Sequence, residues 1–379
     1  MRRLLLFVPA LAVALLAMAS FGTHTAVKAQ DGNLTIRAGD GEQGYSVNQF
    51  LPREVTIAEG TTITWTFPWY EPHIVAFVDG VPPDEPVITQ DAVWPNDQGY
   101  VFSGQIFGNP DNPPAFSVTF PEAGSYMYLC PIHPLMTATV NVVAAGGDTD
   151  TQAEVDARGE AEYQAGLAQI KAVAAVVAGQ GGAITPRADG TKLLEVKVGA
   201  LDVDGNDAMQ FFPAAANINV GDTIVWTSDN ATPHTVTFNM QEAPPFGDPF
   251  ALLKTPEDTF GGQGFRNSGI LWTVPEENSY TSYELTFTAA GSFNYICILH
   301  ADQGMAGTVN VAAATTPTAT VTTTATATAT ATKTATPAAP TAGTGSGGSA
   351  SGAWLLIAGA AAAFMIGGGT LGAATLRRR

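Results

Sequence analysis

The sequence predicts an all-β protein with two tandem Greek-key β-sandwich domains, a helical connector between them, and a C-terminal transmembrane helix. The first observation is an internal repeat, because the segment QFLP at residues 49–52 returns as QFFP at residues 210–213. The second is that both copies continue in short runs of alternating apolar and polar residues between glycine-containing turns, which is typical of half-buried antiparallel strands. A tryptophan that is expected to be buried, Trp65 or Trp226, stands at the corresponding position of each copy. These features predict two sandwiches of roughly 110 residues each.

Within each repeat, the first two of these runs are predicted to form a hairpin. In the first copy the runs at residues 55–57 and 62–65 flank Glu59-Gly60, and in the second copy the runs at residues 217–220 and 223–226 flank Gly221-Asp222. Each repeat ends in a similar closing strand, at residues 139–142 and 308–311.

The connector between the repeats is predicted to be a helix over residues 151–178. Thr151 and Glu154 match a capping box, and Gly179 is expected to end the helix. An apolar stripe lies on one face and consists of Tyr163, Leu167, Ile170, Ala174 and Val177. The stripe favours packing on a sandwich over a role as a solvated spacer.

Both ends of the chain differ from the repeats in composition. Arg2 and Arg3 precede a short apolar run, which favours an export signal over a first transmembrane helix. A segment composed mostly of Thr, Ala, Pro, Gly and Ser is predicted to form an extended stalk. The uncharged segment that follows is closed by three arginines, as in a spanning helix with a cytoplasmic end; removal of this tail during surface sorting is the alternative. The predicted boundaries are 1–29 for the signal peptide, 30–145 for the first domain, 146–189 for the connector, 190–313 for the second domain, 314–351 for the stalk, 353–376 for the anchor and 377–379 for the basic end.

This organisation predicts a single-pass cell-membrane protein, exported by its signal peptide, with its domains on the extracytoplasmic side. The formal net charge is −18, from 34 acidic and 16 basic residues, so the surface should repel nucleic acid. No motif implies a small-molecule substrate.

Histidine and cysteine are scarce and fall into two matching groups. Of 5 histidines, His24 lies in the predicted signal peptide, and the 2 cysteines fall one in each repeat. Each repeat has an upstream Pro-His pair and a downstream Cys-x-x-His followed by Met; the two sets are His73, Cys130, His133 and Met136, and His234, Cys297, His300 and Met305. A thiolate, two imidazoles and a weak thioether are the ligands of a trigonal copper electron-transfer site. Apolar residues around the loop histidines should exclude water and offer a hydrophobic docking face.

Three other interpretations of these residues are weaker. A lone Cys-x-x-His is more often a packed thiol beside a structural histidine, but the repetition argues against that. A disulfide between Cys130 and Cys297 would have to join corresponding buried positions of two domains. Zinc fits the nitrogen and thiolate donors, yet a thioether is a poor zinc ligand.

With these residues in view, both repeats resemble cupredoxins, the family of plastocyanin, amicyanin and pseudoazurin, over roughly residues 31–145 and 190–313. The spacing of His133 and Met136 resembles amicyanin and pseudoazurin, and that of His300 and Met305 resembles plastocyanin. The resemblance implies two type 1 coppers, one in each four-residue set. The residue after the upstream histidine, often Asn in the family, is Ile74 in one copy and Thr235 in the other, so the hydrogen bond that ties this loop to the ligand loop is not expected.

The function that the resemblance implies is transfer of single electrons between redox proteins whose identity the sequence does not reveal. Multicopper oxidases and copper nitrite reductases share the domain but need further histidines for a catalytic copper, so an enzyme is not expected. Copper storage or delivery at the cell surface is the alternative, although such sites usually have open, Met-rich or Cys-rich coordination. A role of one domain as a mere spacer is disfavoured by the intact ligand sets in both.

Overall fold

The computed structural model describes residues 33–80, 83, 86–133, 135–244, 253–274 and 279–313 of the 379-residue chain. The predicted signal peptide, stalk and transmembrane anchor lie outside these residues. Within the described part of the chain, no helix is long and apolar enough to cross a membrane.

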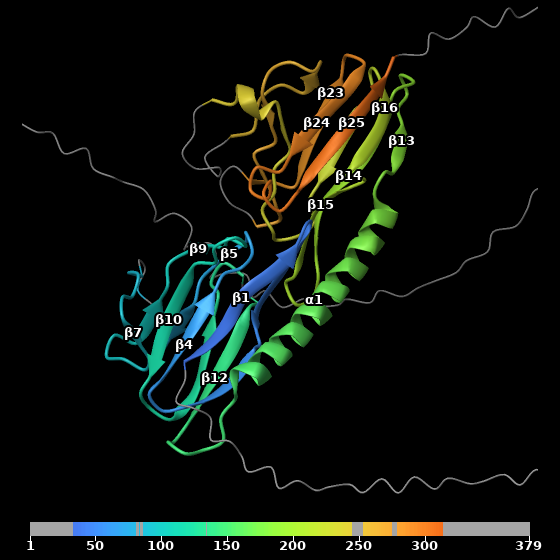
Figure 1. Cartoon of the computed structure of the whole chain (residues 1–379). Coiled ribbons are helices and arrows are strands. Elements are labelled where there is room, and N and C mark those ends of the chain that lie inside the picture. Colours follow the sequence, from blue (N-terminus) through green and yellow to red (C-terminus); the bar gives the residue numbers. More distant parts are fainter. Residues whose placement is uncertain are drawn as a thin grey trace, which may run out of the picture.

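The first sandwich consists of two sheets and a short pair of strands (Figure 1). One sheet has the order β2-β1-β4-β10-β7 and contains β1 (Leu34–Glu42), β2 (Tyr45–Leu51), β4 (Thr61–Thr66), β7 (Ala92–Val93) and β10 (Ala115–Phe120). The other has the order β3-β12-β11-β6-β8 and contains β3 (Glu54–Ala58), β6 (Ala76–Val78), β8 (Tyr100–Phe102), β11 (Gly124–Leu129) and β12 (Thr137–Val143). Strand β5 (Pro72–His73) pairs with β9 (Ile106–Phe107).

The second sandwich repeats this plan. Its first sheet has the order β19-β23-β17-β14-β15, with β13 added to β14, and contains β13 (Ile184–Pro186), β14 (Lys192–Leu201), β15 (Asp207–Phe212), β17 (Thr223–Thr227), β19 (Thr259–Phe260) and β23 (Ser282–Phe287). Its second sheet has the order β16-β25-β24-β18-β20 and contains β16 (Ala215–Asn219), β18 (Thr237–Phe238), β20 (Arg266–Asn267), β24 (Gly291–Ile296) and β25 (Ala306–Ala312). A short 3₁₀ turn, η1 (Met240–Glu242), follows β18, and β21 (Ile270–Leu271) pairs with β22 (Ser279–Tyr280).

The alternation of apolar and polar residues decides which side of each strand faces the core. In β12 and β25, every second residue is buried, so one face packs inward and the other faces outward. The centre of each core is the predicted tryptophan: Trp65 donates a hydrogen bond to the hydroxyl of Tyr128 at 3.1 Å, and Trp226 packs edge-on against Tyr295. Each core extends to the end of the sandwich at which Cys130 or Cys297 lies.

The predicted hairpins are wrong. Strand β3 pairs with β12 and strand β4 pairs with β1 and β10, so the turn at Glu59-Gly60 connects two different sheets. The turn between β16 and β17 does the same, since β16 pairs with β25 and β17 pairs with β14 and β23. Two amphipathic strands joined in this way each bury one face in the same core. The pairs β3–β12 and β1–β4 are moreover parallel, so the sheets are mixed.

The two sandwiches are joined by a continuous sheet. Strand β15 of the second pairs with β2 of the first, through Asp207 with Ser46 and Ala208 with Tyr45, which makes one 11-stranded sheet. Helix α1 (Gln152–Gln180) runs along both sandwiches, as Figure 1 shows.

Helix α1 covers the junction with its apolar stripe. Leu167, Ile170 and Ala174 are buried in a cluster that includes residues of β2, β14 and β15, and Tyr163 and Val177 pack against it. The prediction that the apolar stripe packs on a sandwich, and that the helix is not a solvated spacer, is therefore confirmed. The capping box of Thr151 and Glu154 is also confirmed, but the helix continues through Gly179 and is capped at Gly181.

Candidate metal centres

The first predicted ligand set converges at one end of the first sandwich. His73 lies on β5, Cys130 directly follows β11, His133 lies in the next turn, and Met136 precedes β12. Nδ1 of His73 lies 3.1 Å from Nδ1 of His133, which lies 3.5 Å from Sγ of Cys130. The backbone N–H of Cys130 donates to the carbonyl oxygen of Met136 at 2.9 Å and closes the loop.

The second set has the same arrangement. Nδ1 of His234 lies 3.1 Å from Nδ1 of His300, and Sγ of Cys297 lies 3.4 Å from the latter atom. The N–H of Cys297 donates to the carbonyl oxygen of Met305 at 3.0 Å. In each domain, the donor atoms of the two histidines and the cysteine lie within 4.8 Å of one another, close enough to bind one metal ion. Among the described residues, these are the two groups of His, Cys, Asp or Glu side chains that meet this condition.

Both centres are enclosed. Cys130 and Cys297 are buried free cysteines, so no disulfide joins the domains. The upstream histidines and the methionines, His73, His234, Met136 and Met305, are each at most 1% exposed. Two imidazole nitrogens and a cysteine sulfur converge in each enclosed site, and a buried methionine is bonded through its backbone to the cysteine. This set of donors fits a copper ion of either oxidation state.

Each sulfur accepts a backbone hydrogen bond from the residue after the upstream histidine. The N–H of Ile74 lies 3.3 Å from Sγ of Cys130, and the N–H of Thr235 lies 3.3 Å from Sγ of Cys297. In the second domain, the N–H of Ile298 also donates to Oγ1 of Thr235 at 2.9 Å. The expectation that this hydrogen bond is missing is therefore wrong for the second domain. There the hydroxyl of Thr235 joins the two loops, in place of the asparagine side chain that the family often has at this position.

A glycine in a β-bulge makes room for each upstream imidazole. The bulges fall between Ala38 and Asp40 and between Val198 and Ala200, and each central glycine has a positive φ, +72° at Gly39 and +68° at Gly199. A Cβ at these positions would lie 2.1 Å from Nε2 of His73 and 2.2 Å from Nε2 of His234. Both Nε2 atoms are buried without a hydrogen-bond partner in the described structure. The other ring nitrogen of each histidine, Nδ1, faces the candidate site and is the atom available to a metal ion.

The electrostatics of the metal-free second site favour the metal-binding thiolate. Burial raises the pKa of Cys297, but His300 and His234 outweigh it and bring this pKa well below its ordinary value. Burial lowers the pKa of His300, yet the adjacent Cys297, with further help from Glu71, raises it to about 9. The metal-free site thus holds a thiolate beside an imidazolium, and a metal ion would displace the imidazolium proton.

In the first site the pKa values of the two histidines are shifted in opposite directions. Burial lowers the pKa of His133, but Cys130 and Glu71 overcome this effect and raise it to about 10. The pKa of His73 falls well below its usual value because the ring is buried and lies beside His133.

A residue that sequence reasoning missed lies between the two centres. Glu71 is 7% exposed, and its Oε1 lies 3.4 Å from Nε2 of His133 while its Oε2 lies 3.9 Å from Nε2 of His300. Gln303 donates from Nε2 to Oε2 of Glu71 at 3.3 Å. Burial would raise the pKa of Glu71, but the hydrogen bond from His133 and the charge of nearby imidazoles hold it at about 2.

The two ligand loops face the domain junction. The N–H of Gly44 in the first domain donates to the carbonyl oxygen of Gln303 in the second ligand loop at 2.8 Å. The turn at Gly205 of the second domain lies against Leu135 in the first ligand loop. Leu135 remains 58% exposed, so the expected apolar face is only partly covered.

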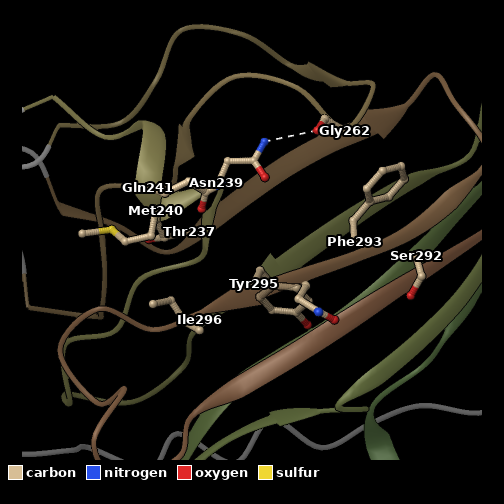
Figure 2. A pocket seen from close by; sticks show the side chains of 10 residues that line it. Thr237, Asn239, Met240, Gln241, Gly262, Ser292, Phe293, Tyr295 and Ile296 are labelled. Carbon is tan, nitrogen blue, oxygen red and sulfur yellow. Dashed lines mark hydrogen bonds between the residues drawn. The ribbon is translucent and has the colours of Figure 1, made fainter.

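A shallow recess in the second sandwich is separate from both centres. It lies between η1 and strand β24 (Figure 2) and has a cavity volume of about 480 Å³. Asn239 donates to the carbonyl oxygen of Gly262 at 3.3 Å across its upper edge. The lining contains no charged side chain and none of the eight ligand residues, so we assign no metal chemistry to it.

Comparisons with known proteins place these centres in a family. The sequence matches the family described as copper binding proteins, plastocyanin/azurin family, over residues 40–143 and again over residues 197–312. Plastocyanin of Scenedesmus fuscus is 29% identical over 116 residues, which cover 31% of this chain and 96% of that protein. Plastocyanin of Vicia faba is 30% identical over 118 residues, covering 31% of this chain and 99% of that protein.

Amicyanin is similar as well. Amicyanin of Paracoccus versutus is 34% identical over 99 residues, or 26% of this chain and 61% of that protein. Among solved structures, a proline-to-glycine variant of amicyanin in its reduced Cu(I) form at pH 4 is 24% identical and covers 31% of this chain and 87% of that chain, with a TM-score of 0.22. Because the family match covers more than half of the sequence, in two successive regions that each contain one ligand set, this chain is a tandem member of the plastocyanin/azurin family of copper-binding proteins.

Proposed function

We propose that this protein is a membrane-anchored, extracytoplasmic blue copper protein with two type 1 copper sites that carries single electrons between redox proteins. The observation that supports this most directly is that each sandwich buries its own Cys/His/His donor group with a methionine beside it. Copper, when bound, supplies the one-electron couple between Cu(II) and Cu(I).

The polypeptide holds the predicted ligands in a fixed arrangement from which water is excluded. The backbone N–H groups of Ile74 and Thr235 fix the cysteine sulfurs, and the glycines of the bulges fix the upstream rings. Ligands held in this way need to move little when the charge of the site changes by one, which is what an electron carrier requires. The polypeptide therefore favours electron transfer over copper storage or delivery, for which exchangeable ligands are needed.

An electron carrier without catalytic copper is also supported by the histidine count. Of the 5 histidines in the sequence, four are in the two sets and the other is His24. Since His24 lies in the predicted signal peptide, the proposed mature protein has no further imidazole for a type 2 or trinuclear copper site. The export signal, the stalk and the membrane anchor lie outside the described residues, and their part in the proposal rests on composition alone.

The test is a copper titration of the full-length protein in detergent, with metal analysis and visible and electron paramagnetic resonance spectra. We expect two coppers and two copper–thiolate signals in the wild type. His73→Ala and His234→Ala should each remove one copper and leave the other signal, so each variant is the matched control of the other. A wild-type protein that stays colourless with cupric ion would refute the proposal, and copper that binds but cannot be rapidly reduced and reoxidised would favour storage.

A further inference from the structure

Both C-terminal histidine ligands direct their outer nitrogens to the same carboxylate. Oε1 of Glu71 lies 3.4 Å from Nε2 of His133, and Oε2 lies 3.9 Å from Nε2 of His300. Since a carboxylate is only about 2 Å wide, the two Nε2 atoms are at most roughly 10 Å apart. The two metal centres therefore face each other across the domain junction, with one side chain between them.

The chemistry of the rings makes this carboxylate an acceptor for Nε2–H of His133 and, across 3.9 Å, a charge partner of Nε2–H of His300. In each site the ring uses Nδ1 toward the cysteine sulfur, so the proton of a neutral imidazole has to be on Nε2. An ionised carboxylate accepts hydrogen bonds and donates none, and it therefore selects this tautomer and fixes the ring plane. Burial strengthens the effect because little water competes: Glu71 is 7% exposed and His300 4%.

The carboxylate itself is held from the second domain. Gln303, which is 3% exposed, donates from its side chain to Oε2 of Glu71 at 3.3 Å, and its own carbonyl oxygen accepts the N–H of Gly44. Glu71 precedes the upstream histidine by two positions, and the corresponding residue of the second repeat is Thr232. The acidic side chain of the first repeat thus reaches the ligand loops of both copies.

We infer that Glu71 is a positioning residue shared by the two metal centres, which orients His133 by accepting its Nε2–H, attracts the Nε2–H of His300 by its charge, and joins the centres into one electrostatic unit. The inference rests on the proposed function, because it presumes copper in both sites. A negative charge that close to both ligand rings stabilises the more positive, oxidised state of each site. Glu71 should therefore lower both reduction potentials.

The experiment is a redox titration of the full-length, copper-loaded protein carrying Glu71→Gln. The amide keeps the shape of the side chain but removes the charge and weakens the acceptor, so both potentials should shift upward while two coppers remain bound. Glu122→Gln is the matched control. Glu122 is exposed and lies two residues before β11, whereas Cys130 follows the other end of that strand. Its substitution should therefore remove the same charge without moving either potential.

The outcomes separate this inference from the proposed function. Failure of the wild type to bind copper would refute the function, whereas a wild type with two coppers and a Glu71→Gln variant with unchanged potentials would refute the inference alone. A shift at only one site would overturn the shared role.

Should the variant not fold, nitrogen-15 spectra of the wild type loaded with Cu(I) test the same point. They should show Nε2-bound protons that exchange slowly with water on both His133 and His300, and fast exchange at either ring would contradict the inference.

Discussion

The glycine that lies against each upstream histidine gives a sharp prediction for one site at a time. In Gly39→Ala, the new Cβ would lie 2.1 Å from Nε2 of His73, whereas contacts below 3.0 Å are essentially never found. The ring would have to move by about 1 Å, several times the roughly 0.2 Å by which ligand distances in a metal site may vary. His73 is 1% exposed, so its ring is enclosed by the protein, and the first site should lose its copper.

The matched control separates this contact from backbone strain. Gly60 also has a positive φ, +85°, but a Cβ there would meet nothing within 4 Å. Gly39→Ala and Gly60→Ala should both lose about 1–2 kcal/mol of stability because alanine is strained in this conformation. Only Gly39→Ala should lose one of two coppers. Gly199→Ala and its control Gly221→Ala should behave in the same way at the second site, since Gly199 lies against His234 while the nearest atom to a Cβ at Gly221 is 3.7 Å away.

The assay is copper content per protein together with thermal unfolding of the metal-free variants. The reasoning would be refuted if Gly39→Ala retained two coppers with unchanged spectra. It would also be refuted if Gly60→Ala lost copper to the same extent, because strain alone would then explain the result.

Three further predictions concern the hydrogen bond between Thr235 and Ile298, the packing of helix α1 at the domain junction, and the release of protons on copper binding. Thr235→Val should leave the N–H of Ile298 without its acceptor, at a cost of about 1–3 kcal/mol, and should alter the spectrum of the second copper alone; an altered first site would contradict this. Ile170→Ala should cost about 2–5 kcal/mol in denaturant unfolding, because Ile170 is fully buried at the junction; a loss below about 0.5 kcal/mol would show that the helix does not secure the sandwiches. Copper binding at pH 7.5 should release at least about one proton per site, because the pKa of His133 is raised to about 10 and that of His300 to about 9, so each imidazolium must lose its proton to bind the metal. The apparent affinity for copper should therefore rise with pH until the pH exceeds both pKa values. Titrations with a pH indicator that detect no released proton would contradict this prediction.

The gathering of the histidines and cysteines into two groups could be predicted from the sequence because much of their pattern is local and repeated. Cys130, His133 and Met136 lie within one loop, and the same order returns in the second copy. The helix could be predicted for a similar reason, since the capping box of Thr151 and Glu154 is a short-range interaction.

Features that depend on the sheet to which a strand belongs could not be predicted. The Gly60 turn looks the same in sequence whether the next strand continues its sheet or crosses to the opposite one, and here it crosses. The role of Glu71 was equally hidden, because its contact with His300 joins residues of different domains. The available signal was a single acidic residue directly after the aromatic pair Trp69-Tyr70 and two positions before a predicted ligand.

The pairing of β2 with β15 has a consequence for any attempt to study one half alone. An unpaired strand edge is a template for association with another chain, and in the intact protein Tyr45 and Ser46 are covered by Ala208 and Asp207. A fragment ending before α1 would expose that edge together with the apolar side chains of Val47 and Leu51, which the helix otherwise covers. Such a fragment is expected to self-associate through this edge, with a stoichiometry that depends on concentration, even where its own core is intact.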